Sequence, residues 1–246
     1  MNIRAASLQH LHGIYFSLGS LIIFVAGPSI VFSVIWLLRG GNALNANFFL
    51  GSALMLAVVA PAFDQLAIGL STDRVEEGAG RREQARIAAR LCSWVGGAVG
   101  ASILLIVIAS LFSPMSLTVV GWLRLVFSVV IGALPIGLAA VSLSFWLSSA
   151  TIRRWANGVS FVSILGAGLI VPPFMLPTAL WQAANVLPTR HYAEIVWASG
   201  FGWPWPWTSS LWLAGFNGVF LITAITGARR VQRRGGAIVA PADRLP

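Results

Sequence analysis

Lysine is absent from this 246-residue chain, and cysteine, histidine and acidic residues are scarce. The sequence contains one cysteine (Cys92), three histidines and seven acidic residues. Without lysine it cannot form the Gly-x-x-x-x-Gly-Lys-Ser/Thr loop that binds phosphate. A single cysteine excludes an internal disulfide and a cysteine metal cluster, and His10 and His12 have no carboxylate or cysteine near them in the sequence. We therefore predict no catalytic residues, no metal site and no cofactor site in this chain.

Charged residues are also few. They make up 9% of the chain, hydrophobic residues make up 57%, and the mean hydropathy is +0.84. Soluble domains carry about 25% charged and roughly 45–50% apolar residues. The net charge of +9, which comes from 16 arginines, is compatible with a nucleic-acid partner. The apolar content favours a membrane protein instead, and it argues against a soluble enzyme, a nucleic-acid-binding domain or a disordered chain.

Long apolar runs indicate an all-α, polytopic membrane protein. A spanning helix needs about 20 mostly apolar residues, and no cleavable signal peptide is apparent. We predict one transmembrane domain over residues 1–235 and a short cytoplasmic tail over residues 236–246. The six predicted spans are Gly13–Leu38, Phe48–Leu70, Leu91–Phe112, Leu123–Leu147, Trp155–Val171 and Trp207–Thr226.

The arginines predict the orientation of these spans. With six spans, thirteen of the 16 arginines lie on the side of the two termini, and Arg39, Arg124 and Arg190 lie on the other. Cytoplasmic loops are enriched in arginine and lysine, so both termini are predicted to be cytoplasmic. Tryptophans favour the interface between membrane and water. Those near predicted span ends are Trp36, Trp94, Trp122, Trp146, Trp155 and Trp207.

The most charged stretch lies between the second and third spans, over residues 71–90. Its acidic residues come early, and Arg82, Arg86 and Arg90 follow at four-residue spacing, which places them on one face of a helix. Gly78 and Gly80 predict a bend, followed by an amphipathic helix. One interpretation is an ordinary positive-inside loop that contacts anionic head groups. The other is a docking element for a cytoplasmic partner.

Residues 171–207, between the fifth and sixth spans, are too apolar for an ordinary loop. Pro177 and Pro188 can each begin a helix, because the fixed φ of proline suits a first helical turn. Neither helix is long enough to span a membrane. Backbone at membrane depth must satisfy its own hydrogen bonds, so short helices that dip in from the outside fit this segment. The alternative is a flat interfacial loop held by its aromatic side chains.

Polar residues also occur inside the predicted spans. Asp64 and Gln65 lie in the second span, near its cytoplasmic end. An aspartate at the centre of a spanning helix costs roughly 2.5–3.5 kcal/mol. Asp64 is therefore predicted to face a translocation path or a subunit contact, unless it reaches the interface and pairs with an arginine. Ser142 and Ser144, in the fourth span, could line a path or bond to their own helix.

Several motifs in this order resemble the type-2 permeases of ABC transporters. Pro173, Leu176 and Pro177 follow the fifth span, and Leu187–Pro188 and Tyr192 come after them. Residues 73–78, which read Asp-Arg-Val-Glu-Glu-Gly, are similar to the acidic entry to that family's coupling helix. The resemblance covers essentially the whole chain. It departs from the family at residues 79–81, which read Ala-Gly-Arg where the family often has Thr-Leu and a proline.

The resemblance implies an export permease of a prokaryotic inner membrane, acting on drugs, lipids or polysaccharides. A second permease copy, identical or different, would complete the pathway, and two copies of a cytoplasmic ATPase subunit would bind ATP and magnesium. The path candidates are Asp64 and Gln65. The residues predicted to couple to the ATPase are Glu76, Glu77, Gly78, Arg81, Arg82 and Arg86. The external gate candidates are Pro173, Pro177, Pro188 and Tyr192.

Other functional classes fit less well. An ion-coupled carrier would normally bring more intramembrane charge than one aspartate. A non-transporting membrane assembly protein is the other alternative. An intramembrane protease is least favoured: Trp197-Ala198-Ser199-Gly200 lacks the first glycine of a serine-hydrolase motif, and no predicted span carries a histidine to act as base.

Overall fold

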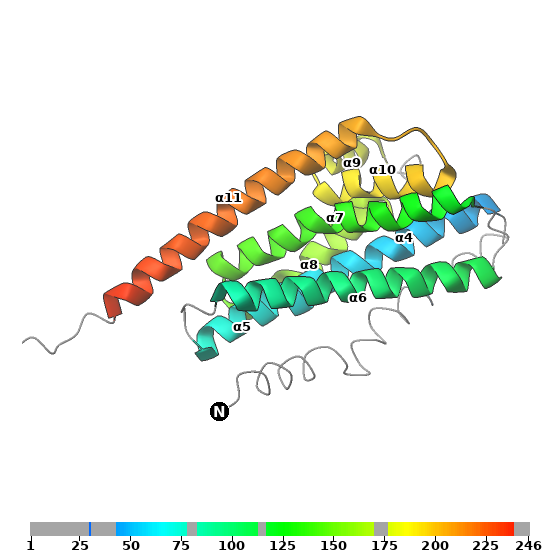
Figure 1. Cartoon of the computed structure of the whole chain (residues 1–246). Helices are drawn as coiled ribbons and strands as arrows, with labels where there is room; N and C mark the ends of the chain where they lie inside the picture. The colour runs from blue at the N-terminus through cyan, green and yellow to red at the C-terminus, as the bar shows by residue number, and fades with distance from the viewer. Residues whose placement is uncertain (1–29, 31–42, 78–82, 113–116, 170–176, 239–246) are drawn as a thin grey trace, which may run out of the picture.

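The computed structural model describes residue 30 and residues 43–77, 83–112, 117–169 and 177–238, which form a bundle of helices without any strand (Figure 1). The first predicted span, Gly13–Leu38, lies outside these ranges apart from Ile30, and so do residues 239–246. The elements are α4 (Ala43–Pro61), the π-helix η2 (Ala62–Ala67), α5 (Ile68–Glu77), α6 (Glu83–Phe112), α7 (Val119–Trp146), α8 (Ser149–Ala167), α9 (Thr178–Ala184), α10 (Pro188–Phe201) and α11 (Trp207–Ile238).

Four stretches of helix are long and apolar enough to cross a membrane. They are Ala46–Arg74, Glu83–Leu111, Val119–Trp146 and Trp207–Arg233, and they coincide with the second, third, fourth and sixth predicted spans. The fifth, Trp155–Val171, corresponds to much of α8, which has 19 residues but is not among these four. Arg153 and Arg154 lie in the first turns of α8 and lower its hydropathy. The count of six spans stays a prediction.

Helix boundaries differ from the predicted ones around the charged stretch. Residues 83–95 contain no glycine or proline, and three alanines and two arginines among them favour helix. They form the beginning of α6, continuous with the third span, instead of a separate helix that precedes it. Residues 78–82 lie outside the described part. At the other end of the chain, α11 continues past the predicted span end at Thr226 and into the predicted tail, to Ile238.

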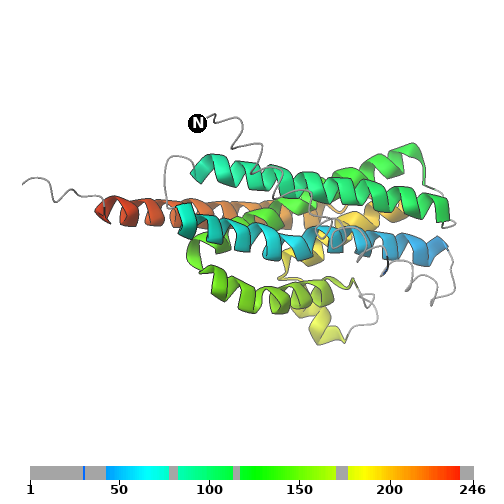
Figure 2. The same cartoon turned by 90° about the horizontal axis from the view of Figure 1, so that it is seen from below.

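The centre of the bundle is formed by α7 and by one continuous rod made of α4, η2 and α5. The rod lies between α6 and α8, and α11 and α10 pack against α7 (Figure 2). In the most apolar part of the rod, 78% of residues are buried, whereas the corresponding part of α11 is 17% buried. The outer helices therefore present apolar side chains such as Leu111, Leu211 and Ile222 to their surroundings, as lipid-facing helices do.

Two glycines let α10 lie close to the centre. Tyr192 of α10 occupies the space where a side chain at Gly132 of α7 would stand, and Trp197 occupies that space beside Gly51 of α4. His191 stacks on Trp212, with ring centroids 5.3 Å apart. Trp212 lies about 8 Å along α11 from the start of that helix. His191 is 5% exposed and Tyr192 is fully buried, so the first turn of α10 lies inside the bundle. With 14 residues, α10 is about 21 Å long, which is too short to cross a hydrocarbon core of about 30 Å.

Candidate functional site

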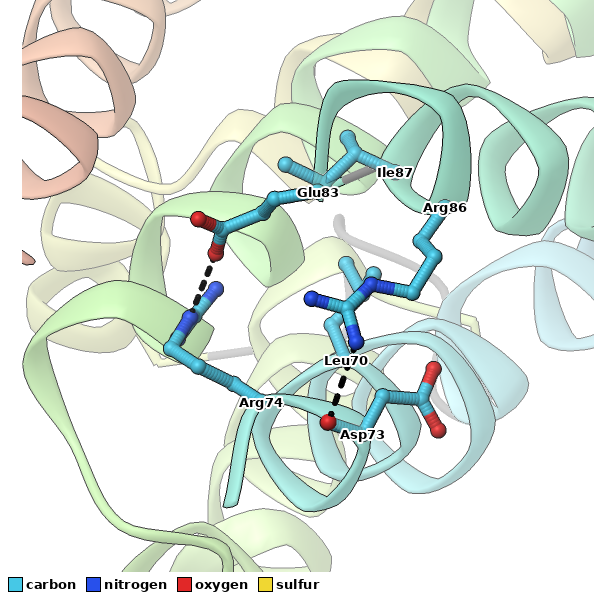
Figure 3. Close-up of a pocket in the computed structure, with 6 residues that line it drawn as sticks. All are labelled: Leu70, Asp73, Arg74, Glu83, Arg86 and Ile87. Carbon is cyan, nitrogen blue, oxygen red and sulfur yellow. Dashed lines mark hydrogen bonds and ion pairs between the residues drawn. The ribbon is translucent and has the colours of Figure 1, made fainter. Parts of the chain in front are cut away.

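Five charged side chains gather where α5 ends and α6 begins, and we call them the charged junction: Asp73, Arg74, Glu83, Arg86 and Arg90. Asp73 and Arg74 lie in the last turns of α5, and the other three lie in the first turns of α6. Together with Leu70 and Ile87, all of them except Arg90 line a small pocket (Figure 3).

Arg74 connects three helices. Its Nε lies 2.7 Å from Oε1 of Glu83 on α6. Its Nη1 donates to the carbonyl oxygen of Ser144 on α7, and its Cζ lies 4.1 Å from the ring centroid of Phe145. Glu83 is buried, with 6% of its surface exposed. One guanidinium therefore bonds the end of α5 to the start of α6 and to the last turns of α7.

Asp73 forms the second link between α5 and α6. Its two carboxylate oxygens accept hydrogen bonds from Arg90, at 2.5 Å from Nε and 2.7 Å from Nη2. Arg86 donates from Nη1 to the backbone oxygen of Asp73, at 3.2 Å. The Arg90 guanidinium lies over Gly69, where any side chain would displace it. A paired contact between a guanidinium and a carboxylate orients the two groups as well as stabilising them.

The charged junction includes only one of the predicted coupling residues, Arg86. Glu76 and Glu77 are the last two residues of α5, while Gly78, Arg81 and Arg82 lie outside the described residues. The prediction did not include the four residues that form the two ion pairs of the charged junction, which are Asp73, Arg74, Glu83 and Arg90. A usable signal was present, because opposite charges stand on both sides of the two glycines and would face each other across a helical hairpin.

The predicted path residues lie on the π-helix. Asp64 and Gln65 belong to η2, which directly follows Pro61 and packs against α7 and α8. Proline lacks the N–H that an α-helix needs at that point, and π-turns inside α-helices occur frequently at functional sites. Of the two serine candidates, Ser142 donates to Oγ1 of Thr223 on α11 at 2.8 Å, so it contributes to the contact between α7 and α11. Ser144 donates to the carbonyl oxygen of Val141 in its own helix at 2.7 Å.

The predicted gate residues begin and anchor the two short helices. Pro177 directly precedes α9, and Pro188 is the first residue of α10. Tyr192 is fully buried and donates to the carbonyl oxygen of Val129 on α7 at 3.3 Å. Pro173 lies outside the described residues. Three of the four candidates thus belong to one element, a hairpin of α9 and α10.

This hairpin contains a buried ion pair that the sequence did not suggest. Nη2 of Arg190 lies 2.8 Å from Oε1 of Glu194, four residues further along α10. Ser209 of α11 donates to the other carboxylate oxygen of Glu194. Cζ of Arg190 lies 4.0 Å from the ring centroid of Trp181 on α9. The sequence placed Arg190 in an external segment, whereas its side chain is only 3% exposed.

Four long apolar helices around a shared core indicate a membrane-embedded, all-helical protein. Comparison of the chain with models of protein families, with curated proteins and with solved structures finds no match. Its function therefore has to be argued from the charged junction and from the hairpin of α9 and α10.

Proposed function

We propose that this chain is the transmembrane permease subunit of an ATP-driven ABC exporter, and that a separate ATPase subunit drives it. The observation that carries the proposal is the charged junction. Arg74 bonds to Glu83 on α6 and to Ser144 on α7, and Asp73 bonds to Arg90. A force applied to the end of α5 would reach α6 and α7 through these bonds.

The second support is the arrangement of charge along the bundle. Most arginines in the described residues lie toward the end where α5 and α11 end and α6 and α8 begin (Figure 1), whereas Arg124 lies near the opposite end. Under the positive-inside rule the arginine-rich end is cytoplasmic, where an ATPase would dock. These arginines are Arg74, Arg86, Arg90, Arg153, Arg154, Arg229, Arg230, Arg233 and Arg234.

At the outer end, the hairpin of α9 and α10 would form the external gate. Tyr192 locks α10 against Gly132 and Val129 of α7, so movement of α7 would move the gate as well. In this mechanism ATP closes the ATPase dimer and the charged junction carries the motion. A second permease copy would complete the pathway. Closure of the pathway on the cytoplasmic side would accompany its opening on the outer side.

Co-purification tests the proposal. The chain is expressed with each candidate ABC ATPase subunit of its source cell in turn, and ATP hydrolysis is measured in lipid nanodiscs. We expect a complex that contains two ATPase copies. Amphipathic compounds should stimulate its ATP hydrolysis at least about two-fold. Absence of a complex, or of stimulation by any amphipathic compound in a broad panel, would overturn the permease assignment.

Two variants separate docking from transmission. Glu76→Arg combined with Glu77→Arg changes the end of α5 and should release the ATPase. Glu83→Gln removes the negative charge that pairs with Arg74 inside the junction, so it should keep the ATPase bound but abolish stimulation. Arg153→Gln, at an exposed position near the same end, is the matched control and should change neither. Normal stimulation in a folded Glu83→Gln complex would contradict the role of the junction.

The π-helix favours an ion-coupled carrier as the second candidate, because it places Asp64 on an irregular turn within an apolar helix. Carriers use intramembrane carboxylates as proton or cation sites. Transport driven by a proton gradient without ATP, and lost in Asp64→Asn, would support the carrier over the permease.

A further inference from the structure

Arg190 is buried, yet only part of its guanidinium is hydrogen-bonded. Nη2 pairs with Glu194, whereas Nε and Nη1 are buried without an acceptor among the described residues. A guanidinium carries five N–H donors, and buried donors in folded proteins are nearly always bonded. The described residues around Arg190 therefore supply fewer acceptor atoms than its guanidinium has donors.

Glu194 does not supply the missing acceptors. One of its carboxylate oxygens accepts from Arg190, and the other accepts from Ser209. The Glu194 side chain is 32% exposed, so solvent screens part of its charge. The almost completely buried Arg190 guanidinium thus faces a Glu194 carboxylate that is partly screened and also bonded to Ser209. A further negative group would therefore be favourable beside Arg190.

The covering over Arg190 is thin. Its guanidinium lies between Trp181, at 4.0 Å from the ring centroid, and Trp197, at 5.8 Å. Trp197 is held inside the bundle by α4, whereas Trp181 belongs to the seven-residue α9, in which only Ala184 is buried. Raising α9 would break the cation–π contact of Trp181 and a small amount of packing, and it would open one side of the guanidinium.

The chemistry around the site defines its ligand. A guanidinium with free donors binds carboxylate and phosphate oxygens. Leu180 precedes Trp181 on α9, Val186 follows the end of α9, and Trp212 stacks on His191, the residue after Arg190. The apolar side chains of Leu180, Val186 and Trp212 are 54%, 70% and 51% exposed. We propose that Arg190 binds the acidic head group, a phosphate or a carboxylate, of an amphipathic molecule, and that α9 is the lid that admits it.

Dodecyl phosphate is a suitable probe, with dodecanol as its uncharged counterpart. The full chain is purified in an uncharged detergent, and binding is measured by titration calorimetry. We expect dodecyl phosphate to bind at least about ten-fold more tightly than dodecanol. Arg190→Gln should remove this preference. Trp181→Ala should speed both association and dissociation, because it removes the lid contact.

Glu194→Gln distinguishes a ligand site from a purely structural ion pair. It removes the competing carboxylate and keeps the guanidinium, so it should strengthen phosphate binding several-fold. Arg124→Gln is the matched control, because Arg124 also lies near an aromatic ring, at 5.8 Å from the centroid of Trp205. It should leave binding unchanged. Equal affinity of the unmodified chain and Arg190→Gln, or weaker phosphate binding in Glu194→Gln, would overturn the proposal.

The same titration in nanodiscs identifies the source of the head group. If the occupant is a membrane lipid, nanodiscs of anionic phosphatidylglycerol should suppress dodecyl phosphate binding, and nanodiscs of net-neutral phosphatidylcholine should not. If the occupant is a free amphiphile, both should allow binding. The assay contains no ATPase, so a failure of this site and a failure of the permease proposal would be recognised separately.

Discussion

The guanidinium of Arg74 and the carboxylate of Glu83 meet at 2.7 Å and join α5 to α6, although the two residues lie at the ends of different helices. Their side chains are 13% and 7% exposed. Because Arg74 also bonds to Ser144, this pair fixes the relative positions of the last turns of α5, the first turns of α6 and the last turns of α7.

Removing one charge of this pair should destabilise the bundle. Glu83→Gln leaves the Arg74 guanidinium buried without its ionic partner, which costs about 3–5 kcal/mol for a buried pair. We expect a clear fall in the midpoint temperature of thermal unfolding, which is measured by tryptophan fluorescence in detergent micelles. Arg153→Gln serves as the control because Arg153 is exposed, and its free energy of unfolding should stay within about 0.5 kcal/mol of that of the unmodified chain.

Replacing both charges should be milder than removing one. Arg74→Met together with Glu83→Leu leaves no unpaired charge, and such replacements are often neutral or stabilising. The double variant should therefore recover much of the midpoint lost in Glu83→Gln. If Glu83→Gln unfolds at the same temperature as the unmodified chain, the pair does not hold the helices together.

The sequence predicted the long apolar helices well because composition alone carries that signal. Phe48–Leu70 lies within the rod of α4, η2 and α5, and Leu123–Leu147 coincides with α7 up to the last residue of that helix, Trp146. The sequence also predicted that Pro177 and Pro188 begin short helices, because proline fixes φ wherever it stands. α9 and α10 begin at or directly after these residues.

The sequence did not predict contacts between residues that lie far apart along the chain. Arg74 and Ser144 are separated by 70 positions, and no local pattern indicates that they meet. The burial of Arg190 was equally hidden, because the sequence placed it only on the external side, near the start of a short helix that begins at Pro188. Its burial depends on Trp181, Trp197 and Glu194 converging from two helices, which only the folded arrangement reveals.

Gly132 should not tolerate a side chain. A methyl group there would overlap the ring of Tyr192, which is fully buried and has nowhere to move. Gly132→Ala should therefore displace α10 from α7, with a cost of about 1–3 kcal/mol for overpacking a core. The readout is the thermal midpoint, together with the rate of limited proteolysis.

Gly218→Ala provides the matched control for this substitution. Gly218 also lies in a helix, but a methyl group there would meet no atom within 4 Å, and alanine favours helix over glycine. Its midpoint should be unchanged or slightly higher. Tyr192→Ala added to Gly132→Ala should relieve the overlap. If Gly132→Ala behaves like Gly218→Ala, α10 does not pack on α7 in this way.

Cysteine accessibility tests whether the hairpin of α9 and α10 dips into the membrane. The native Cys92 is exposed and is first changed to serine. Leu180 is 54% exposed and Ala184 is 3% exposed. In detergent, a maleimide should therefore react quickly at Leu180→Cys and slowly at Ala184→Cys. In native membranes, lipid should slow the reaction at Leu180→Cys at least ten-fold. Equally fast reaction in both environments would indicate a flat external loop.

Labelling of intact cells tests the orientation that the arginines predict. Arg153 lies near the start of α8 and Thr178 is the first residue of α9, and both are exposed. If the arginine-rich end is cytoplasmic, a maleimide that cannot cross membranes should reach Thr178→Cys in intact cells. It should reach Arg153→Cys only after permeabilisation. Residue 153 lies near the start of α8 and residue 178 lies beyond the end of α8, so each position is the internal control for the other. The reverse pattern would place the charged junction outside the cell, where no ATP-hydrolysing subunit could dock, and the proposed coupling would fail with it.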